Sequence, residues 1–308
     1  MVLDLNTEKD LQFFLNFENS IDSQNNIVQV GRSKQAKSFG KRVLPSGGGN
    51  EVDGAGFAHQ PSQDCIFNLG QNGDTEVAST VVTILENQEL VLIVDNLFDV
   101  LGLSELIIKL EIGSKLTIIE RNNLEINEAL LIEHKKGSEF VYQKLYESSG
   151  NSVLTVNQIG DNCTTKIQNI VRASNIKLAI DQKVFQRGKE QIVEHKTKFI
   201  LDNNSDLKVA HYGQSCVESA ECIIDQKIKG VILDSDSKVE MQPLLEIDSD
   251  SSTSNHGASV GEFDANEIFY LQSRGLDSTQ TQKILVDSFL DDFFDNIQPI
   301  CVRERWQD

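Results

Sequence analysis

Apolar and polar residues alternate with a period of two through the long middle of the chain. The apolar positions of three such stretches are Leu106, Ile108, Leu110 and Ile112, then Cys163, Thr165 and Ile167, then Ile176, Leu178 and Ile180. A period of two places every second side chain on one face, so this alternation predicts half-buried β-strands.

Turn signals interrupt the alternation at Gly113, Gly137, Gly150, Gly160 and Asn203. They are irregularly spaced, and no helical periodicity lies between them. Many short strands without intervening helices predict a mainly β fold, which could be a sandwich, a barrel or a solenoid. Periodicity alone does not choose among these, although a left-handed hexapeptide solenoid is disfavoured because apolar residues do not recur every six positions.

The period changes near the carboxyl end. Asp264 precedes Glu267 at the spacing of a capping box, and Gly275 should end the helix that follows. Asp277 and Gln280 repeat the cap ahead of a second helix. The apolar positions of this second helix are Val286, Phe289, Leu290, Phe293, Phe294 and Ile297, with Asp287, Asp291, Asp292 and Asp295 on the other face. Such an amphipathic helix favours a role in covering the β core, and it could also dock a partner.

The amino-terminal zone has a weaker pattern. Leu11, Phe14 and Leu15 lie on one side of a predicted helix, and the glycine-rich stretch from Leu44 to Gly56 predicts a flexible loop.

The charge balance excludes some functions. The 308 residues hold 28 basic and 47 acidic side chains, which gives a net charge of −19. Sequence-independent attraction to nucleic acid or to an anionic membrane surface needs clustered lysine and arginine, so neither partner is expected.

The lack of a recognisable secretory signal and the pattern of cysteines lead us to expect a reducing compartment. The amino terminus has acids beside its apolar residues and does not resemble a secretory signal, and no stretch approaches the roughly 18 apolar residues of a membrane span. The five cysteines are an odd number scattered along the chain, which does not suggest a disulfide framework. A cytoplasmic location is expected, or a plastid one if a transit peptide has been removed.

Motifs for chemistry are sparse. The glycines at 47–49 and at 113 lack the lysine and serine or threonine context of a phosphate-binding loop, so we expect no nucleotide to bind this chain. Cys216, Cys222 and His211 are close in sequence, but a six-residue offset on a strand spans about 20 Å, which favours a structural role for the cysteines. His256 follows an acidic loop and precedes a glycine, where its imidazole could stay accessible to a metal.

The carboxyl-terminal third resembles a known family. The segments 243–247 (PLLEI) and 254–276 (SNHGASVGEFDANEIFYLQSRGL) resemble the signature of the SufB/SufD family of iron–sulfur cluster assembly proteins, and the SufD branch is favoured. The matching positions are Pro243, Glu246, Ile247, His256, Gly257, Ala258, Gly261, Phe269, Tyr270, Ser273, Arg274 and Gly275. Position 254 is serine where many relatives have cysteine, and the tryptophan-rich amino-terminal motif is not evident. More diffuse similarity extends over about 77–297.

The resemblance implies a right-handed parallel β-helix, and so chooses among the β folds. We divide the chain accordingly into an amino-terminal segment and linker (1–72), a parallel β-helix core (73–262) and a helical region (263–308). It also implies that His256 is a ligand of iron or of a cluster, with Glu246 and Glu262 as weaker metal candidates. The residues expected to dock partners are Phe269, Tyr270, Arg274, Phe289 and Phe293.

The function implied by the resemblance is that of a non-catalytic scaffold subunit. It would pair with a SufB-like β-helix subunit, dock a SufC-like ABC-type ATPase and share a transient iron–sulfur cluster with its partner; a homodimer is a further option. Two other classes remain open: a β-helix carbohydrate-active enzyme, which would need clustered carboxylates, and a self-associating structural β-solenoid.

Overall fold

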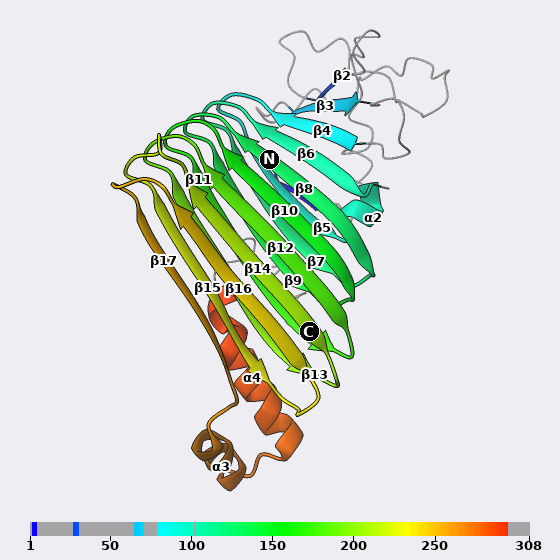
Figure 1. Cartoon of the computed structure of the whole chain (residues 1–308). Helices are drawn as coiled ribbons and strands as arrows, with labels where there is room; N and C mark the ends of the chain where they lie inside the picture. Colours follow the sequence, from blue (N-terminus) through cyan, green and yellow to red (C-terminus); the bar gives the residue numbers. More distant parts are fainter. Residues whose placement is uncertain (1, 5–26, 31–64, 71–78, 102, 295–308) are drawn as a thin grey trace, which may run out of the picture.

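The computed structural model describes residues 2–4, 27–30, 65–70, 79–101 and 103–294. Within them the chain winds as a solenoid in which successive strands alternate between two sheets (Figure 1). Each coil adds one strand to each sheet, in parallel to the strand of the coil before it. The predicted parallel β-helix with carboxyl-terminal helices is confirmed.

The two sheets face each other across the interior of the solenoid. Sheet A contains, in spatial order, β1 (Val2–Asp4), β5 (Glu89–Asp95), β7 (Lys115–Asn122), β9 (Glu139–Tyr146), β11 (Thr164–Ser174), β13 (Ile192–Asp202), β15 (Ile223–Ile232) and β17 (Thr253–Gly261). Sheet B contains β16 (Lys238–Ile247), β14 (Asp206–Ser215), β12 (Lys177–Gln186), β10 (Gly150–Gln158), β8 (Ile126–His134), β6 (Glu105–Leu110), β4 (Ser79–Ile84), β3 (Cys65–Gly70) and β2 (Ile27–Val30). Among the described strands, the pairs β2–β3 and β3–β4 are antiparallel and the others are parallel.

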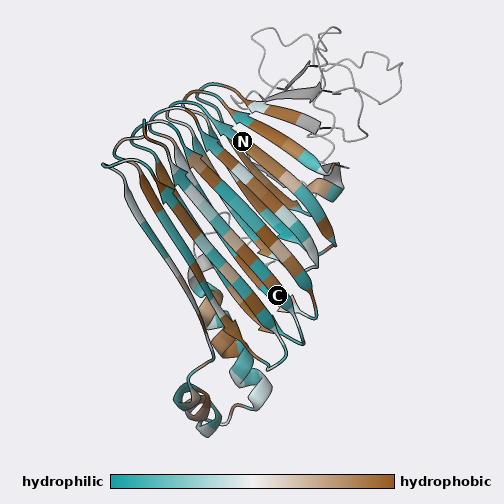
Figure 2. Ribbon diagram, in the orientation of Figure 1, coloured by the Kyte–Doolittle hydropathy of each residue, from teal (hydrophilic) through white to brown (hydrophobic). Residues whose placement is uncertain are grey.

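Alternation along each strand builds the interior of the solenoid. Strand β12 alternates strictly between buried inward side chains and partly exposed outward ones. Because neighbouring coils are in register, each inward side chain stacks on its equivalent in the next coil, as Leu178 does on Leu207. The bands of apolar and polar residues along the strands are visible in Figure 2. Each fully buried leucine, isoleucine or phenylalanine contributes about 1.5–3 kcal/mol.

The predicted strand around residue 108 ends earlier than its pattern suggests. Leu106, Ile108 and Leu110 are buried, but Ile112 is 46% exposed and lies beyond the end of β6. The chain turns there through Gly113, whose φ of +67° is a left-handed conformation that favours glycine. A short helix, α2 (Leu97–Leu101), also interrupts the part of the chain where the sequence predicted strands alone.

Both carboxyl-terminal helices begin as predicted. In α3 (Ala265–Ser273) the Asp264 side chain caps the first turn by accepting from the backbone N–H of Asn266. Before α4 (Ser278–Phe294), Asp277 and Gln280 exchange hydrogen bonds of 2.8 and 3.1 Å between side chain and backbone. Gly275, with φ of +96°, follows the end of α3.

Helix α4 packs on the outer face of sheet A. Leu290 is fully buried there among outward-facing apolar side chains of sheet A, and Val286 and Phe289 pack at its sides. The strand residues of this cluster are Ile93, Ile119, Leu145, Ile170, Ile200 and Val231. The helix therefore covers part of the outer face of sheet A, as the amphipathic pattern favoured. The predicted amino-terminal helix and the glycine-rich loop at 44–56 lie outside the described residues.

Candidate functional site

His256 lies in β17, the last strand of sheet A. It pairs in register with Gln226 of β15, whose side chain is fully buried inside the solenoid. Residues paired in a parallel sheet point to the same face, so His256 continues the inward-facing column of Gln226. No described coil follows β17 in sheet A, and every residue of β17 is exposed. An inward position at the end of the solenoid thus leaves this imidazole accessible.

A cluster of buried polar side chains, which includes Gln226, lies behind His256. His195 and His211 stack inside the solenoid with ring centroids 3.4 Å apart and ring planes at 14°. His195 Nε2 donates to Gln182 Oε1 at 2.5 Å, and His211 Nε2 lies 2.9 Å from Thr197 Oγ1. Burial lowers the pKa of His211 to about 3; burial, with a smaller effect from His211, lowers the pKa of His195 well below its ordinary value. Both imidazoles are therefore neutral at physiological pH.

Several polar atoms in this group have no hydrogen-bond partner within the described part of the chain. They are Nδ1 of His195, Nδ1 of His211, and both Nε2 and Oε1 of Gln226. A buried polar atom without a partner costs about 1–3 kcal/mol, and each one in a native structure calls for an explanation.

Glu246 does not approach His256. It lies on β16, where the exposed positions alternate with half-buried inward ones, and it is one of the exposed, outward residues. Its carboxylate accepts a hydrogen bond from the hydroxyl of Tyr212 on the neighbouring strand. Glu246 and His256 are thus on different sheets and on opposite faces.

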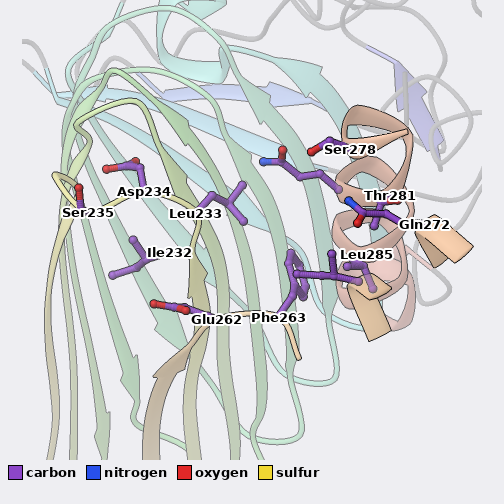
Figure 3. Close-up of a pocket in the computed structure, with 12 residues that line it drawn as sticks. Ile232, Leu233, Asp234, Ser235, Glu262, Phe263, Gln272, Ser278, Thr281 and Leu285 are labelled. Atoms are coloured by element: carbon purple, nitrogen blue, oxygen red, sulfur yellow. The ribbon is translucent and has the colours of Figure 1, made fainter. Parts of the chain in front are cut away.

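Glu262 lies in a third place, apart from both His256 and Glu246. It follows β17 and lines a pocket of about 410 Å³ between the solenoid and the helices. Figure 3 shows Asp234 and Ser235 on the solenoid side of this pocket and Thr281 and Leu285 on the helical side. Among the described residues, no group of three or more histidine, cysteine, aspartate or glutamate side chains could hold a metal ion. His256, Glu246 and Glu262 therefore form no common site within this chain.

The residues predicted to dock partners divide into two groups. Phe269 and Tyr270 on α3 are 72% and 56% exposed, and the guanidinium carbon of Arg274 lies 5.2 Å from the centroid of the Tyr270 ring. Phe289, by contrast, packs on sheet A, with the Nζ atoms of Lys198 and Lys229 at 4.9 and 5.6 Å from its ring centroid. The side chain of Phe293 lies outside the described residues.

One of the two cysteines considered as metal ligands, Cys222, has structural contacts. Cys222 is buried, and its thiol lies 3.3 Å from the Gly188 carbonyl oxygen. Burial raises the pKa of this thiol, which disfavours the thiolate that binds metals. His211, the third member of that sequence cluster, stacks on His195 inside the solenoid.

Sequence reasoning missed a buried ion cluster in the interior. The side chain of Lys144 is fully buried, its Nζ lies 3.2 Å from Glu120 Oε2, and it also contacts Glu128 Oε1. Tyr142 donates to Glu120 at 2.7 Å and Ser152 donates to Glu128 at 2.6 Å. The stretch from Glu139 to Tyr146 contains the signal, because Lys144 occupies an inward position of the period-two pattern between Tyr142 and Tyr146.

Comparison with known proteins gives one matching family model. Residues 153–289 match the model described as "SUF system FeS cluster assembly, SufBD core domain". This span contains β11 to β17, most of β10, α3 and all but the end of α4, and it includes His256.

Curated relatives match over shorter segments. An iron–sulfur cluster assembly SufBD family protein of Synechocystis is 33% identical over 77 residues, which are 25% of this chain and 17% of that protein. The iron–sulfur cluster assembly protein SufD of Escherichia coli is 40% identical over 53 residues, or 17% of this chain and 12% of that protein. SufD of Bacillus subtilis is 32% identical over 66 residues, or 21% and 15%. The matched segments thus span less than a fifth of each of these three relatives. Within the described part of this chain, no helix is both long enough and apolar enough to cross a membrane.

Proposed function

From the confirmed resemblance to the SufB/SufD family, with SufD as the nearer branch, we propose that this chain is a non-catalytic scaffold subunit in SUF-type iron–sulfur cluster assembly. The observation that carries the proposal is the position of His256, which lies within the matched core domain at the open end of the solenoid. Iron and sulfide are the cargo of such an assembly, and the chain's part is to present ligands and surfaces.

The open end of the solenoid favours pairing with a second β-helix. Strands β16 and β17 are the last of their sheets, so each has one edge without a described neighbour. Unpaired edge N–H and C=O groups bind added strands readily. Leu244 on β16 is 50% exposed and Val260 on β17 is 46% exposed, which adds apolar surface to this end. We assign this end to a SufB-like subunit and not to a second copy, because two copies of this chain would each carry a net charge of −19 and would repel each other.

Helix α3 supplies the surface that we assign to a SufC-like ATPase. None of its residues is buried, although it carries Phe269 and Tyr270. A groove of about 570 Å³ adjoins it, lined by Tyr270, Leu271, Ile284 and Leu285 among others. Exposed aromatic side chains beside an apolar groove are suited to anchoring a protein partner. Because Leu290 fastens α4 to sheet A, movement of a docked ATPase would be transmitted to the strands.

His256 is the residue that we assign to the cargo. A neutral imidazole is a good ligand for iron, and its position on the edge strand leaves room for ligands from the paired subunit. The cluster would therefore be shared between subunits and released when they separate.

Replacing His256 with alanine should lower the cluster yield of the reconstituted complex at least about tenfold, because a direct ligand is lost. Folding and complex formation should stay unchanged, since the side chain is exposed at the end of the solenoid. Yield is measured by the visible absorption of the assembled cluster, and complex formation by gel filtration. Gln242→Ala, on the outward face of β16, is the matched control. Equal yields from the His256→Ala and wild-type complexes would disprove the assignment.

A further inference from the structure

The polar side chain nearest to His256 along its inward column is Gln226, and its amide is unsatisfied. Gln226 is fully buried, and neither its nitrogen nor its oxygen has a hydrogen-bond partner within the described residues. Gln158 and Gln186 also have a buried amide oxygen without a partner, but their amide nitrogens donate hydrogen bonds of 2.9 and 3.1 Å. Gln226 differs from these two glutamines in that neither atom of its amide is paired within the described residues.

The surroundings of Gln226 leave its amide space. On the opposite strand β14, the inward position at this level is Gly213, and a Cβ atom there would lie 2.9 Å from Gln226 Nε2. Any larger residue at 213 would press on the amide. The glycine therefore keeps a polar group free in a layer that an apolar side chain could fill.

Burying an unpaired amide costs stability unless a ligand pairs with it. We infer that Gln226 and His256 are two ligands of one metal site at the end of the solenoid. The His256 imidazole binds a first-row divalent metal ion from the exposed side, and the carboxamide oxygen of Gln226 binds the same ion from the buried side. This inference rests on the proposed function and extends it by a second ligand from the same chain. Nitrogen and neutral oxygen donors together suit a divalent ion such as Fe²⁺.

If Gln226 binds metal, replacing it should change stability and metal affinity in opposite directions. Gln226→Leu removes the unpaired amide and keeps a side chain of similar size, so the thermal midpoint should rise by about 2 °C. The same change should weaken metal binding at least about tenfold. A residue with a purely structural role would show no loss of metal affinity.

The test is a titration of the full-length chain with Co²⁺ alone, followed by visible absorption, together with thermal unfolding of each variant. We expect His256→Ala to abolish binding, Gln226→Leu to weaken it with a raised midpoint, and Gln226→Glu to restore it by returning an oxygen donor. Gln242→Leu, on the exposed face of β16, should change neither quantity.

Two results would overturn the inference. One is unchanged Co²⁺ affinity in Gln226→Leu when His256→Ala has lost it, which would leave the His256 assignment standing. The other is an absence of Co²⁺ binding by the wild-type chain. In that case the scaffold proposal is still judged by the cluster yield of the complete complex.

Discussion

Replacing Lys144 with alanine is expected to lower the free energy of unfolding by about 3–5 kcal/mol, because it leaves Glu120 and Glu128 buried without their shared cation. The lysine side chain is fully buried, as is that of Glu120, while that of Glu128 is 2% exposed. Burial by itself would lower the pKa of Lys144, but the two carboxylates outweigh it and hold that pKa above its ordinary value. Urea denaturation, followed by circular dichroism, measures the loss.

Two comparisons isolate the buried charge. Lys135 pairs with Glu111 at 2.7 Å on the surface, and Lys135→Ala should cost no more than about 1 kcal/mol. Adding Glu120→Gln and Glu128→Gln to Lys144→Met should recover much of the stability lost in Lys144→Met alone, since no unpaired charge remains buried. A loss below about 1 kcal/mol in Lys144→Ala would show that the three side chains do not form the ion cluster described.

Acid should destabilise the protein from below about pH 6.5, through the buried histidines. Burial lowers the pKa of His134 and of His211 to about 3, and that of His195 well below its ordinary value. In the unfolded chain each imidazole titrates near pH 6.5. Between these values the unfolded state binds more protons, so stability is complete above pH 6.5 and falls as the pH decreases.

The size of the acid effect follows from the width of that window. Each buried histidine should cost about 2 kcal/mol on going from pH 7 to pH 5. The raised pKa of Glu120 acts in the opposite direction, so variants are needed to isolate the histidines. His195→Gln combined with His211→Gln should flatten the stability profile between pH 7 and pH 5 by about 4 kcal/mol. Gln242→Ala, at an exposed and non-titratable position of β16, should leave the slope unchanged; equal slopes in all three proteins would contradict the account.

The strands could be predicted because burial on one face imposes a period of two. The strands around Ile108, Ile167 and Leu178 were predicted correctly for that reason. The helix caps at Asp264 and Asp277 could be predicted because side chains within three residues complete them. Local rules of this kind need no knowledge of the rest of the fold.

The surface on which α4 packs could not be predicted from the sequence. Its apolar stripe predicted a buried face but not the surface that it covers. That surface consists of outward-facing residues such as Ile119 and Ile170, each next to an inward apolar or polar residue that is also buried. Pairs such as Ile118–Ile119 break the alternation and indicate a strand covered on both faces.

The candidate site could be predicted only in part. His256 was found through resemblance, because a motif of local residues surrounds it. Gln226, 30 positions earlier, comes beneath His256 only through the register of β15 and β17. Strand register likewise places Glu246 on the outward face of β16, away from His256 although the two are near in sequence. Coil length and register decide such contacts, and no local pattern encodes them.

Co-purification tests the central claim most directly. The tagged chain is co-expressed with a SufB-like β-helix subunit and a SufC-like ATPase and is recovered by affinity and gel filtration. The account predicts a stable complex containing both partners, and Phe269→Asp, on an exposed face of α3, should release the ATPase while keeping the β-helix subunit. Recovery of the folded wild-type chain without either partner would contradict the scaffold function.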